Sequence, residues 1–227
     1  MIIYGINPVA EAVRAGRASE LLVQDARNER LRVLVAEARA AGVTVKTLPL
    51  DAFRRIVPAG VHQGGAAGVR PAPAASLDAL ARPGGDPPLI VVLDGVEDPH
   101  NLGAILRSVH AAGGSGVVRQ SRHAAPLDGA AAKASAGAVH HVRVADVVNI
   151  ARALEDLKEQ GVWTVGLDAD ADLQYDEVDL TLPTAIVVGA EGSGLRRLVR
   201  ERCDRLASIP MRGQLGSLNV SVAAATL

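Results

Sequence analysis

The sequence predicts an α/β protein in which helices cover both faces of a parallel sheet, preceded by a small α/β module. Strand-like and helix-like segments alternate along most of the chain, as they do in parallel sheets. The run LIVVLDGV at 89–96 is apolar on consecutive residues, which indicates a strand buried on both faces. The Pro- and Gly-rich segment 71–88 separates two patterned regions and reads as a linker with one short helical turn. We therefore expect a small domain at 1–70, the linker at 71–88 and the main domain at 89–227.

The small domain alternates helices and strands. Asn7 precedes Pro8, so a helix is predicted with Asn7 as its N-cap and Gly16 at its end. The remaining elements are a strand at 19–23, a helix at 29–41 ended by Gly42, a strand at 43–48 and a short helix at 51–57.

The main domain continues the alternation. Strands are predicted at 89–96, 116–119, 141–144, 162–167, 184–188 and 206–210, and helices at 101–112, 128–136, 147–160 and 195–203, with a last helix after residue 217. Ligands of such sheets bind beyond the carboxyl ends of the strands, which is where functional motifs are expected.

Composition narrows the function. Aromatic residues make up 2% of the chain, which disfavours RNA binding through several stacking platforms. Cys203 is the single cysteine, so neither an intrachain disulfide nor a cysteine-based zinc site is expected. The start resembles no signal peptide, and no apolar run approaches a membrane span, so a cytoplasmic protein is expected. The first 75 residues carry 10 basic and 6 acidic side chains, against 14 and 19 in the rest, which suggests that the small domain meets a polyanion.

Three motifs follow predicted strands. In DGVEDPHNLGAILRS (94–108), Asn101 is placed to cap a helix, and Arg107 in that helix could bind a phosphate or a carboxylate. IVVGAEGSGL (186–195) is a glycine-rich loop with Glu191 inside it, and its spacing differs from the dinucleotide-binding fingerprint. In IPMRGQLGSLNVSVAAATL (209–227), Ser217 is a natural N-cap, whereas Asn219 in the first turn is a poor helix former. Each motif alone fits an ordinary capped helix or a glycine turn.

Together and in this order, the motifs closely resemble the SpoU (TrmH) family of RNA ribose 2′-O-methyltransferases in the SPOUT class. The segments IYGINPVAEAV (3–13) and VHQGGAAGVRP (61–71) resemble the family's N-terminal substrate-binding domain. The resemblance thus covers nearly the whole chain, and the two-domain layout is most similar to the 23S rRNA guanosine 2′-O-methyltransferase branch.

The resemblance implies a parallel-sheet SPOUT domain whose C-terminal segment forms a trefoil knot, a feature that periodicity cannot show. It also implies a homodimer and S-adenosylmethionine as the cofactor, held mainly through backbone groups and without a metal. The implied cofactor-binding residues are Gly189, Ala190, Glu191, Gly192, Gly194, Ile209, Met211, Ser217 and Leu218. The implied catalytic residues are Arg107, Glu191, Asn101, Asn219 and Ser217.

The family uses an arginine at the position of Arg107 near the ribose hydroxyl, either as a base or as a phosphate clamp. The clamp is favoured because the guanidinium gives up its proton only above about pH 12. Glu191 would orient Arg107 or the ribose, Asn101 and Asn219 would fix the substrate and the loop, and Ser217 either contacts a ligand or caps the helix. The general base stays unassigned.

The substrate is expected to be RNA, with rRNA favoured over tRNA and with phosphate contacts from the small domain. The basic residues named for those contacts are Arg14, Arg17, Arg27 and Arg30. Several other side chains are expected to be structural. His100 and the acidic cluster of Asp94, Glu97 and Asp98 are expected in solvated loops. His140 and His141 are expected on a strand without an acidic partner, and Cys203 is expected in the core. The alternatives are a tRNA guanosine methyltransferase, a silent RNA-binding relative and, more remotely, a nucleotide-linked oxidoreductase.

Overall fold

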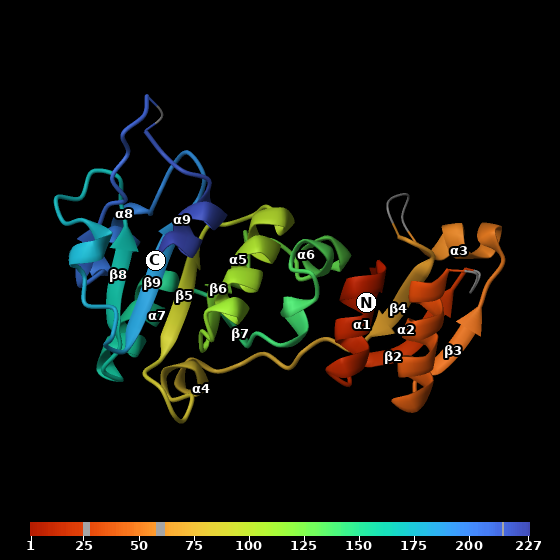
Figure 1. The fold of residues 1–227 in the computed structure, drawn as a ribbon. Coiled ribbons are helices and arrows are strands. Elements are labelled where there is room, and N and C mark those ends of the chain that lie inside the picture. Colours follow the sequence, from red (N-terminus) through yellow and green to blue (C-terminus); the bar gives the residue numbers. More distant parts are fainter. Residues whose placement is uncertain (25–27, 58–61, 215) are drawn as a thin grey trace.

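The computed structural model describes residues 1–24, 28–57, 62–214 and 216–227. Two sheets lie on either side of the segment predicted as a linker (Figure 1). Both follow the expected α/β pattern, and no helix in the described ranges has the length and apolar character needed to cross a membrane.

The first sheet has four strands in the order β1-β4-β2-β3. Its strands are β1 (Ile2–Tyr4), β2 (Ala18–Val23), β3 (Thr44–Thr47) and β4 (Gly65–Val69), and its helices are α1 (Ile6–Arg14), α2 (Glu29–Ala40) and α3 (Leu50–Ile56). β2 and β3 run parallel, while β4 runs antiparallel to β1 and β2. β1 and β4 were not predicted, because β1 has only 3 residues and β4 consists mostly of Gly and Ala.

The N-cap predicted for α1 is wrong. The helix begins at Ile6 and its N-cap is Gly5, whose φ of 99° suits glycine. Asn7 therefore lies inside the first turn, where its Oδ1 accepts a hydrogen bond of 3.0 Å from Arg30. The predicted ends are confirmed, since Gly16 and Gly42 follow α1 and α2 with positive φ angles.

The second sheet has six parallel strands in the order β10-β8-β9-β5-β6-β7. Its strands are β5 (Leu89–Asp94), β6 (Gly116–Gln120), β7 (Val144–Val147), β8 (Trp163–Leu167), β9 (Thr184–Gly189) and β10 (Arg205–Ala207). Its helices are α5 (Pro99–Ala111), α6 (Gly129–Ala134), α7 (Ile150–Glu159), α8 (Arg197–Arg202) and α9 (Val220–Thr226).

Alternate residues of the central strands serve two cores. In β5, Val91 and Leu93 pack with α5 and α9, whereas Ile90 and Val92 pack with α7 and α8. The continuous apolar run that predicted a doubly covered strand is thereby explained. The segment 71–88 carries the expected helical turn, α4 (Leu77–Ala81), and the side chain of Leu80 is fully buried in the second core. This segment is therefore packed against the sheet for part of its length. The trefoil knot stays a prediction.

Two further predictions are corrected here. α5 begins at Pro99 with Asp98 as its N-cap, because proline fits the first helical position and Asp98 accepts from the His100 N–H at 2.9 Å. Asn101 is therefore inside the helix. The strand predicted at 141–144 begins only at Val144, as β7, where its pairing with β6 starts. A 3₁₀ turn (Ala138–His140) precedes it, and residues 141–143 continue as a turn.

The two parts of the chain meet where α6 and the 3₁₀ turn pack on β1 and α1. A Cβ at Gly129 would lie only 3.1 Å from the Tyr4 ring and 3.2 Å from the Ile2 carbonyl oxygen, so glycine eases this close approach. His141 was expected to lack an acidic partner, but its Nε2 lies 3.0 Å from Oε2 of Glu11 in α1. Sequence proximity could not show that contact.

Candidate active site

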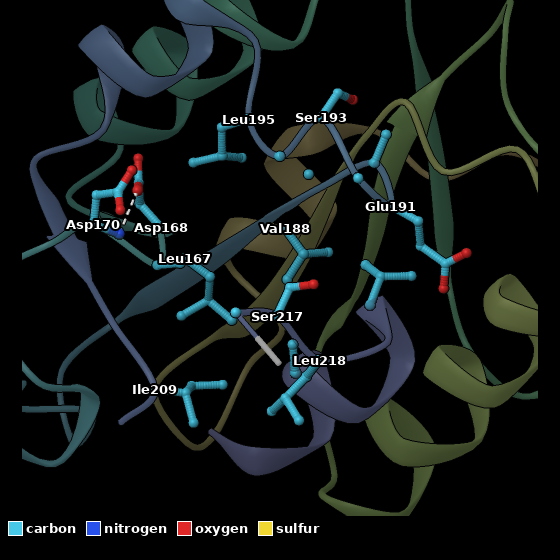
Figure 2. A pocket seen from close by; sticks show the side chains of 18 of the residues that line it. Leu167, Asp168, Asp170, Val188, Glu191, Ser193, Leu195, Ile209, Ser217 and Leu218 are labelled. Atoms are coloured by element: carbon cyan, nitrogen blue, oxygen red, sulfur yellow. Dashed lines mark hydrogen bonds between the residues drawn. The ribbon is translucent and has the colours of Figure 1, made fainter. Parts of the chain in front are cut away.

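A cavity of about 440 Å³ opens beyond the carboxyl ends of β8, β9 and β10 (Figure 2). It lies at the sheet edge where ligands of parallel α/β folds bind. Every residue predicted to hold the cofactor lines it: Gly189, Ala190, Glu191, Gly192, Gly194, Ile209, Met211, Ser217 and Leu218.

The glycine-rich loop after β9 folds back on itself to form one wall of this cavity. The backbone groups of Ala190 and Gly194 exchange two hydrogen bonds, with N–O distances of 3.2 and 2.9 Å. A Cβ built on Gly189 would lie 2.1 Å from the carbonyl carbon of Gly194, so only glycine fits there. Gly192 and Gly194 have φ angles of 79° and 65°, which glycine adopts without strain. The loop thus presents main-chain atoms to a ligand.

The end of β8 forms a further wall of the cavity, and none of its residues was among the predicted site residues. Figure 2 shows Leu167, Asp168 and Asp170 at the side of the cavity away from Glu191. The signal was present, because the sequence LDAD directly follows a strand of the parallel sheet.

Asp168 holds this wall in place. Its carboxylate accepts from the Asp170 N–H at 3.0 Å and is paired with the Arg200 guanidinium. Burial acts to raise the pKa of Asp168, but these hydrogen bonds and the Arg200 charge outweigh it and hold that pKa below its usual value.

Asn219 connects the three motifs. Its Nδ2 donates to Oδ1 of Asn101, at 3.0 Å, and to Oε1 of Glu191. Its own Oδ1 accepts from the Ser221 N–H at 2.9 Å and caps α9. Asn219 is therefore the N-cap of α9, and the capping role considered for Ser217 is wrong. Ser217 lies two residues earlier, in the wall of the cavity.

A second cavity, of about 330 Å³, adjoins the first. It is lined by Gly95, Val96, Glu97, Asp98, Asn101, Ala190, Glu191 and Val220. Ala190, Glu191 and Val220 line both cavities, so the hydrogen bonds joining Asn101, Asn219 and Glu191 lie at their boundary. A reaction between a group in one cavity and a group in the other would take place at this boundary.

Arg107 is the predicted site residue that the structure does not bring into this network. It lies on α5, six residues after Asn101, and its side chain is exposed. Within the described ranges it has no hydrogen-bond or ion-pair partner and is absent from the linings of both cavities. Its side chain is therefore available to a bound molecule.

Asp94 and Cys203 were both expected to be structural residues outside the site. Asp94 was expected in a solvated loop, but its side chain is fully buried and ion-paired with Arg196. Cys203 directly follows α8 and packs on the second core, and burial raises the pKa of its thiol to about 12. Cys203 therefore packs against the core as expected, although it is only partly buried.

Comparisons with known proteins agree with the site geometry. Residues 88–227 match the SpoU rRNA Methylase family, and residues 2–75 match the RNA 2′-O ribose methyltransferase substrate-binding domain. The chain is 43% identical over 230 residues to the 23S rRNA (guanosine-2′-O-)-methyltransferase RlmB of Pseudomonas syringae, covering 97% of this chain and 90% of that protein. Other relatives are named tRNA/rRNA methyltransferases, one of them from Mycolicibacterium gilvum at 45% identity over 98% of this chain and 73% of that protein.

A solved structure supports the same assignment. The SpoU methyltransferase AviRb from Streptomyces viridochromogenes, in complex with the cofactor AdoMet, superposes with a TM-score of 0.85 at 26% identity, covering all of this chain and 86% of that one. The fold and site therefore define an α/β RNA methyltransferase. The chain belongs to the SpoU family.

Proposed function

We propose that this chain transfers a methyl group from S-adenosylmethionine to the 2′-hydroxyl of a guanosine in RNA, most specifically in 23S rRNA. The observation that carries this proposal is the pair of adjoining cavities whose boundary holds Glu191, Asn219 and Asn101. One cavity would take the cofactor and the other the target nucleoside.

The larger cavity suits the cofactor. Its glycine-rich wall offers backbone N–H and C=O groups to adenine and to the methionine part, and Leu167, Val188 and Ile209 offer apolar contacts. When bound, S-adenosylmethionine supplies a methyl carbon attached to a sulfonium sulfur. That sulfur is a good leaving group because it departs as a neutral thioether. The work left to this chain is alignment of the hydroxyl with that carbon.

The asparagine pair and Glu191 suit that alignment. Asn101 is largely buried and Asn219 is fixed by its capping role, so neither side chain needs to reorganise when the ribose arrives. Oε2 of Glu191 has no hydrogen-bond partner within the described ranges, so it can accept from the ribose 2′-hydroxyl. A hydroxyl held in this way is oriented for attack, and the proton that it loses as the new C–O bond forms would pass to this carboxylate or to solvent. Arg107 supplies the phosphate clamp.

Glu97 supports guanosine as the target. It lines the second cavity, is exposed and has no hydrogen-bond partner in the part of the chain that the structure describes. An ionised carboxylate is an acceptor only, and guanine places an N1–H and an N2–H₂ donor on one edge. Phosphate would be repelled by Glu97, Asp98 and Glu191, so a base or ribose fits the cavity better.

The small domain, which would end near residue 70 and be joined to the main domain by a linker at 71–88, would bind RNA phosphates. Arg14 is held by Glu11 and Glu37, while Arg30 is held by Asn7. Arg27 lies outside the described residues. Contacts between the small domain and RNA phosphates would give affinity and salt dependence more than sequence specificity.

We also propose a homodimer that acts in the cytoplasm, where ribosomal RNA is found. The side chain of Val222 on α9 is 51% exposed and does not line the cofactor cavity. This apolar group is available to a second copy beside the site.

The test is transfer of labelled methyl from S-adenosylmethionine to transcripts of 23S rRNA and tRNA, followed by mapping of the modified ribose. Transfer to a guanosine of the rRNA transcript is expected, and transfer confined to tRNA would favour the alternative substrate. Calorimetry with S-adenosylmethionine and with NAD separates a methyltransferase from a nucleotide-linked oxidoreductase, and methyl transfer itself separates an enzyme from a silent RNA-binding relative. Arg107→Ala should lose transfer with cofactor binding retained, whereas Arg152→Ala on α7 is the matched control on the other face of the sheet.

A further inference from the structure

We infer that Asp94 and Arg196 form a clamp that positions the glycine-rich loop 190–195 and thereby sets the affinity for S-adenosylmethionine. This inference deepens the proposed function and rests on it. Neither side chain lines the cofactor cavity, so both would act through the loop as positioning residues.

Asp94 is the last residue of β5, and its side chain is fully buried. Both of its carboxylate oxygens are used by one residue: Oδ2 accepts from the Arg196 backbone N–H at 2.8 Å, and Oδ1 accepts from Arg196 Nε at 2.7 Å and from its Nη2. A buried carboxylate requires such compensation. The contact joins residues 102 positions apart and fixes both the main chain and the side chain of Arg196.

Arg196 stands directly after the glycine-rich loop, so its position fixes the end of that loop. With its amide oxygen turned toward Arg196, Gln120 at the end of β6 accepts from Nη2 and Nη1 at 3.0 and 3.2 Å. The guanidinium thus reaches the carboxyl ends of two strands, β5 and β6, while the loop begins at the end of β9. Two adjacent strands of the central sheet, β5 and β6, therefore hold the residue at which the loop ends.

The other end of the loop is closed by its own backbone. Gly189 permits the turn, and Ala190 and Gly194 close it with two hydrogen bonds. Leu195 lies close to Gly166 of β8, where an added Cβ would come within 2.8 Å of Leu195 Cδ1. A loop with several glycines has many alternative conformations. The backbone hydrogen bonds and the Leu195 contact restrict these conformations, and we infer that the clamp selects one of them.

The clamp also connects the loop with the second cavity. Asp94 is followed by Gly95, whose Cβ position lies 3.5 Å from the Ala190 side chain. Gly95 and Ala190 both line the second cavity. Moving the loop would therefore change the boundary at which Glu191 meets Asn219.

The experiment compares Asp94→Asn, Arg196→Met and Arg196→Lys in the full chain. Asp94→Asn and Arg196→Met should weaken S-adenosylmethionine binding in calorimetry by about 10-fold to 100-fold, as for supporting partners behind a binding group. They should raise the KM for the cofactor more than they lower kcat, and Arg196→Lys should restore part of the affinity. Hydrogen exchange at the Gly194 amide should accelerate, while amides of β5 and β9 keep their protection.

The matched control is Asp204→Asn, which removes the charge of a partly buried carboxylate that contacts Lys158 and Thr164 away from the cavity. This variant should lower the melting temperature and leave cofactor binding unchanged. If Asp94→Asn does not fold, Arg196→Met carries the test, because that side chain is 55% exposed.

Unchanged cofactor affinity and unchanged Gly194 exchange in folded Arg196→Met protein would overturn the clamp. Failure of the wild-type chain to bind S-adenosylmethionine would instead overturn the proposed function, so the two failures are distinguishable.

Discussion

Asn219 offers the sharpest test of the site because it has two separable functions. Its Oδ1 caps α9, and its Nδ2 joins Asn101 to Glu191. Asn219→Ala removes both functions, whereas Asn219→Ser removes the amide donor and keeps a side chain that is favoured at N-caps.

The expected loss of stability follows from these contacts. Losing the cap costs about 1 kcal/mol, and leaving Oδ1 of the buried Asn101 without its donor costs about 1–3 kcal/mol. Asn219→Ala should therefore lower the free energy of unfolding by about 2–4 kcal/mol, and Asn219→Ser by about 1 kcal/mol less than that. A domain with stability of about 5–15 kcal/mol remains folded in both cases.

The expected loss of activity differs from the loss of stability. Both variants remove the donor that fixes Glu191 and Asn101, so both should lower methyl transfer by about 10-fold to 100-fold, equivalent to about 1.4–2.7 kcal/mol in the activation barrier. The assays are thermal unfolding and initial rates of RNA methylation with saturating cofactor. Asn101→Ala, alone and combined with Asn219→Ala, measures the coupling between the two side chains.

An Asn219→Ser enzyme that methylates RNA at the wild-type rate would contradict the role of Asn219 at the site. That result would mean that Asn219 serves the fold alone. Activity that falls in strict proportion to melting temperature across the series would lead to the same conclusion.

Two further predictions concern the glycine loop and a buried histidine. Gly189→Ala should abolish measurable cofactor binding in calorimetry, because its Cβ would overlap Gly194, whereas Gly213→Ala, with no atom near the new Cβ, should bind normally. Burial, followed by the charges of neighbouring groups, lowers the pKa of His140 from 6.5 to about 4. Since the folded-state pKa is depressed, this histidine's contribution to stability is complete above about pH 6.5 and is lost as the pH falls toward 4, by at most about 3 kcal/mol. Unfolding at several pH values should show a shallower acid loss for His140→Leu, and equal slopes would contradict this. The charged or titratable groups that affect it are His141, Arg17 and Glu11.

The sequence was informative where structure is determined locally. Consecutive apolar residues in β5 and glycines after α1 and α2 correctly indicated a buried strand and two helix ends. The nine predicted cofactor residues line one cavity because the motifs follow strands of a single parallel sheet, whose carboxyl ends meet at one edge. The resemblance to the SpoU family added the order of the motifs, which no single motif carried.

The cap positions were the weak point, for a physical reason. Asn7, Asn101 and Ser217 are all acceptable N-caps by residue type, yet Gly5, Asp98 and Asn219 are the caps observed. Neighbouring positions satisfy the same local preference, and long-range contacts choose between them. Asn101 and Asn219 bond each other across 118 residues, which local reasoning cannot detect.

Partners that are distant in sequence were missed for the same reason. Asp94 was predicted to belong to an exposed acidic cluster, but it is buried and paired with Arg196. His141 was predicted to lack an acidic partner, but it contacts Glu11 of α1. The loop after β9 was recognisable from its glycines, but the contacts that hold it were not.

These observations bear on how a backbone-lined site gains specificity. A loop that offers main-chain groups to a ligand can tolerate many side-chain changes, so its recognition depends on the conformation that the surroundings impose. In this chain that conformation is imposed by Gly189 at one end, by Asp94 and Arg196 at the other, and by Asn219 on Glu191 in between. Substitutions at these supporting positions should therefore affect cofactor affinity more than substitutions at exposed loop positions such as Ser193. The site is best understood as a flexible segment held in one shape by rigid strand ends.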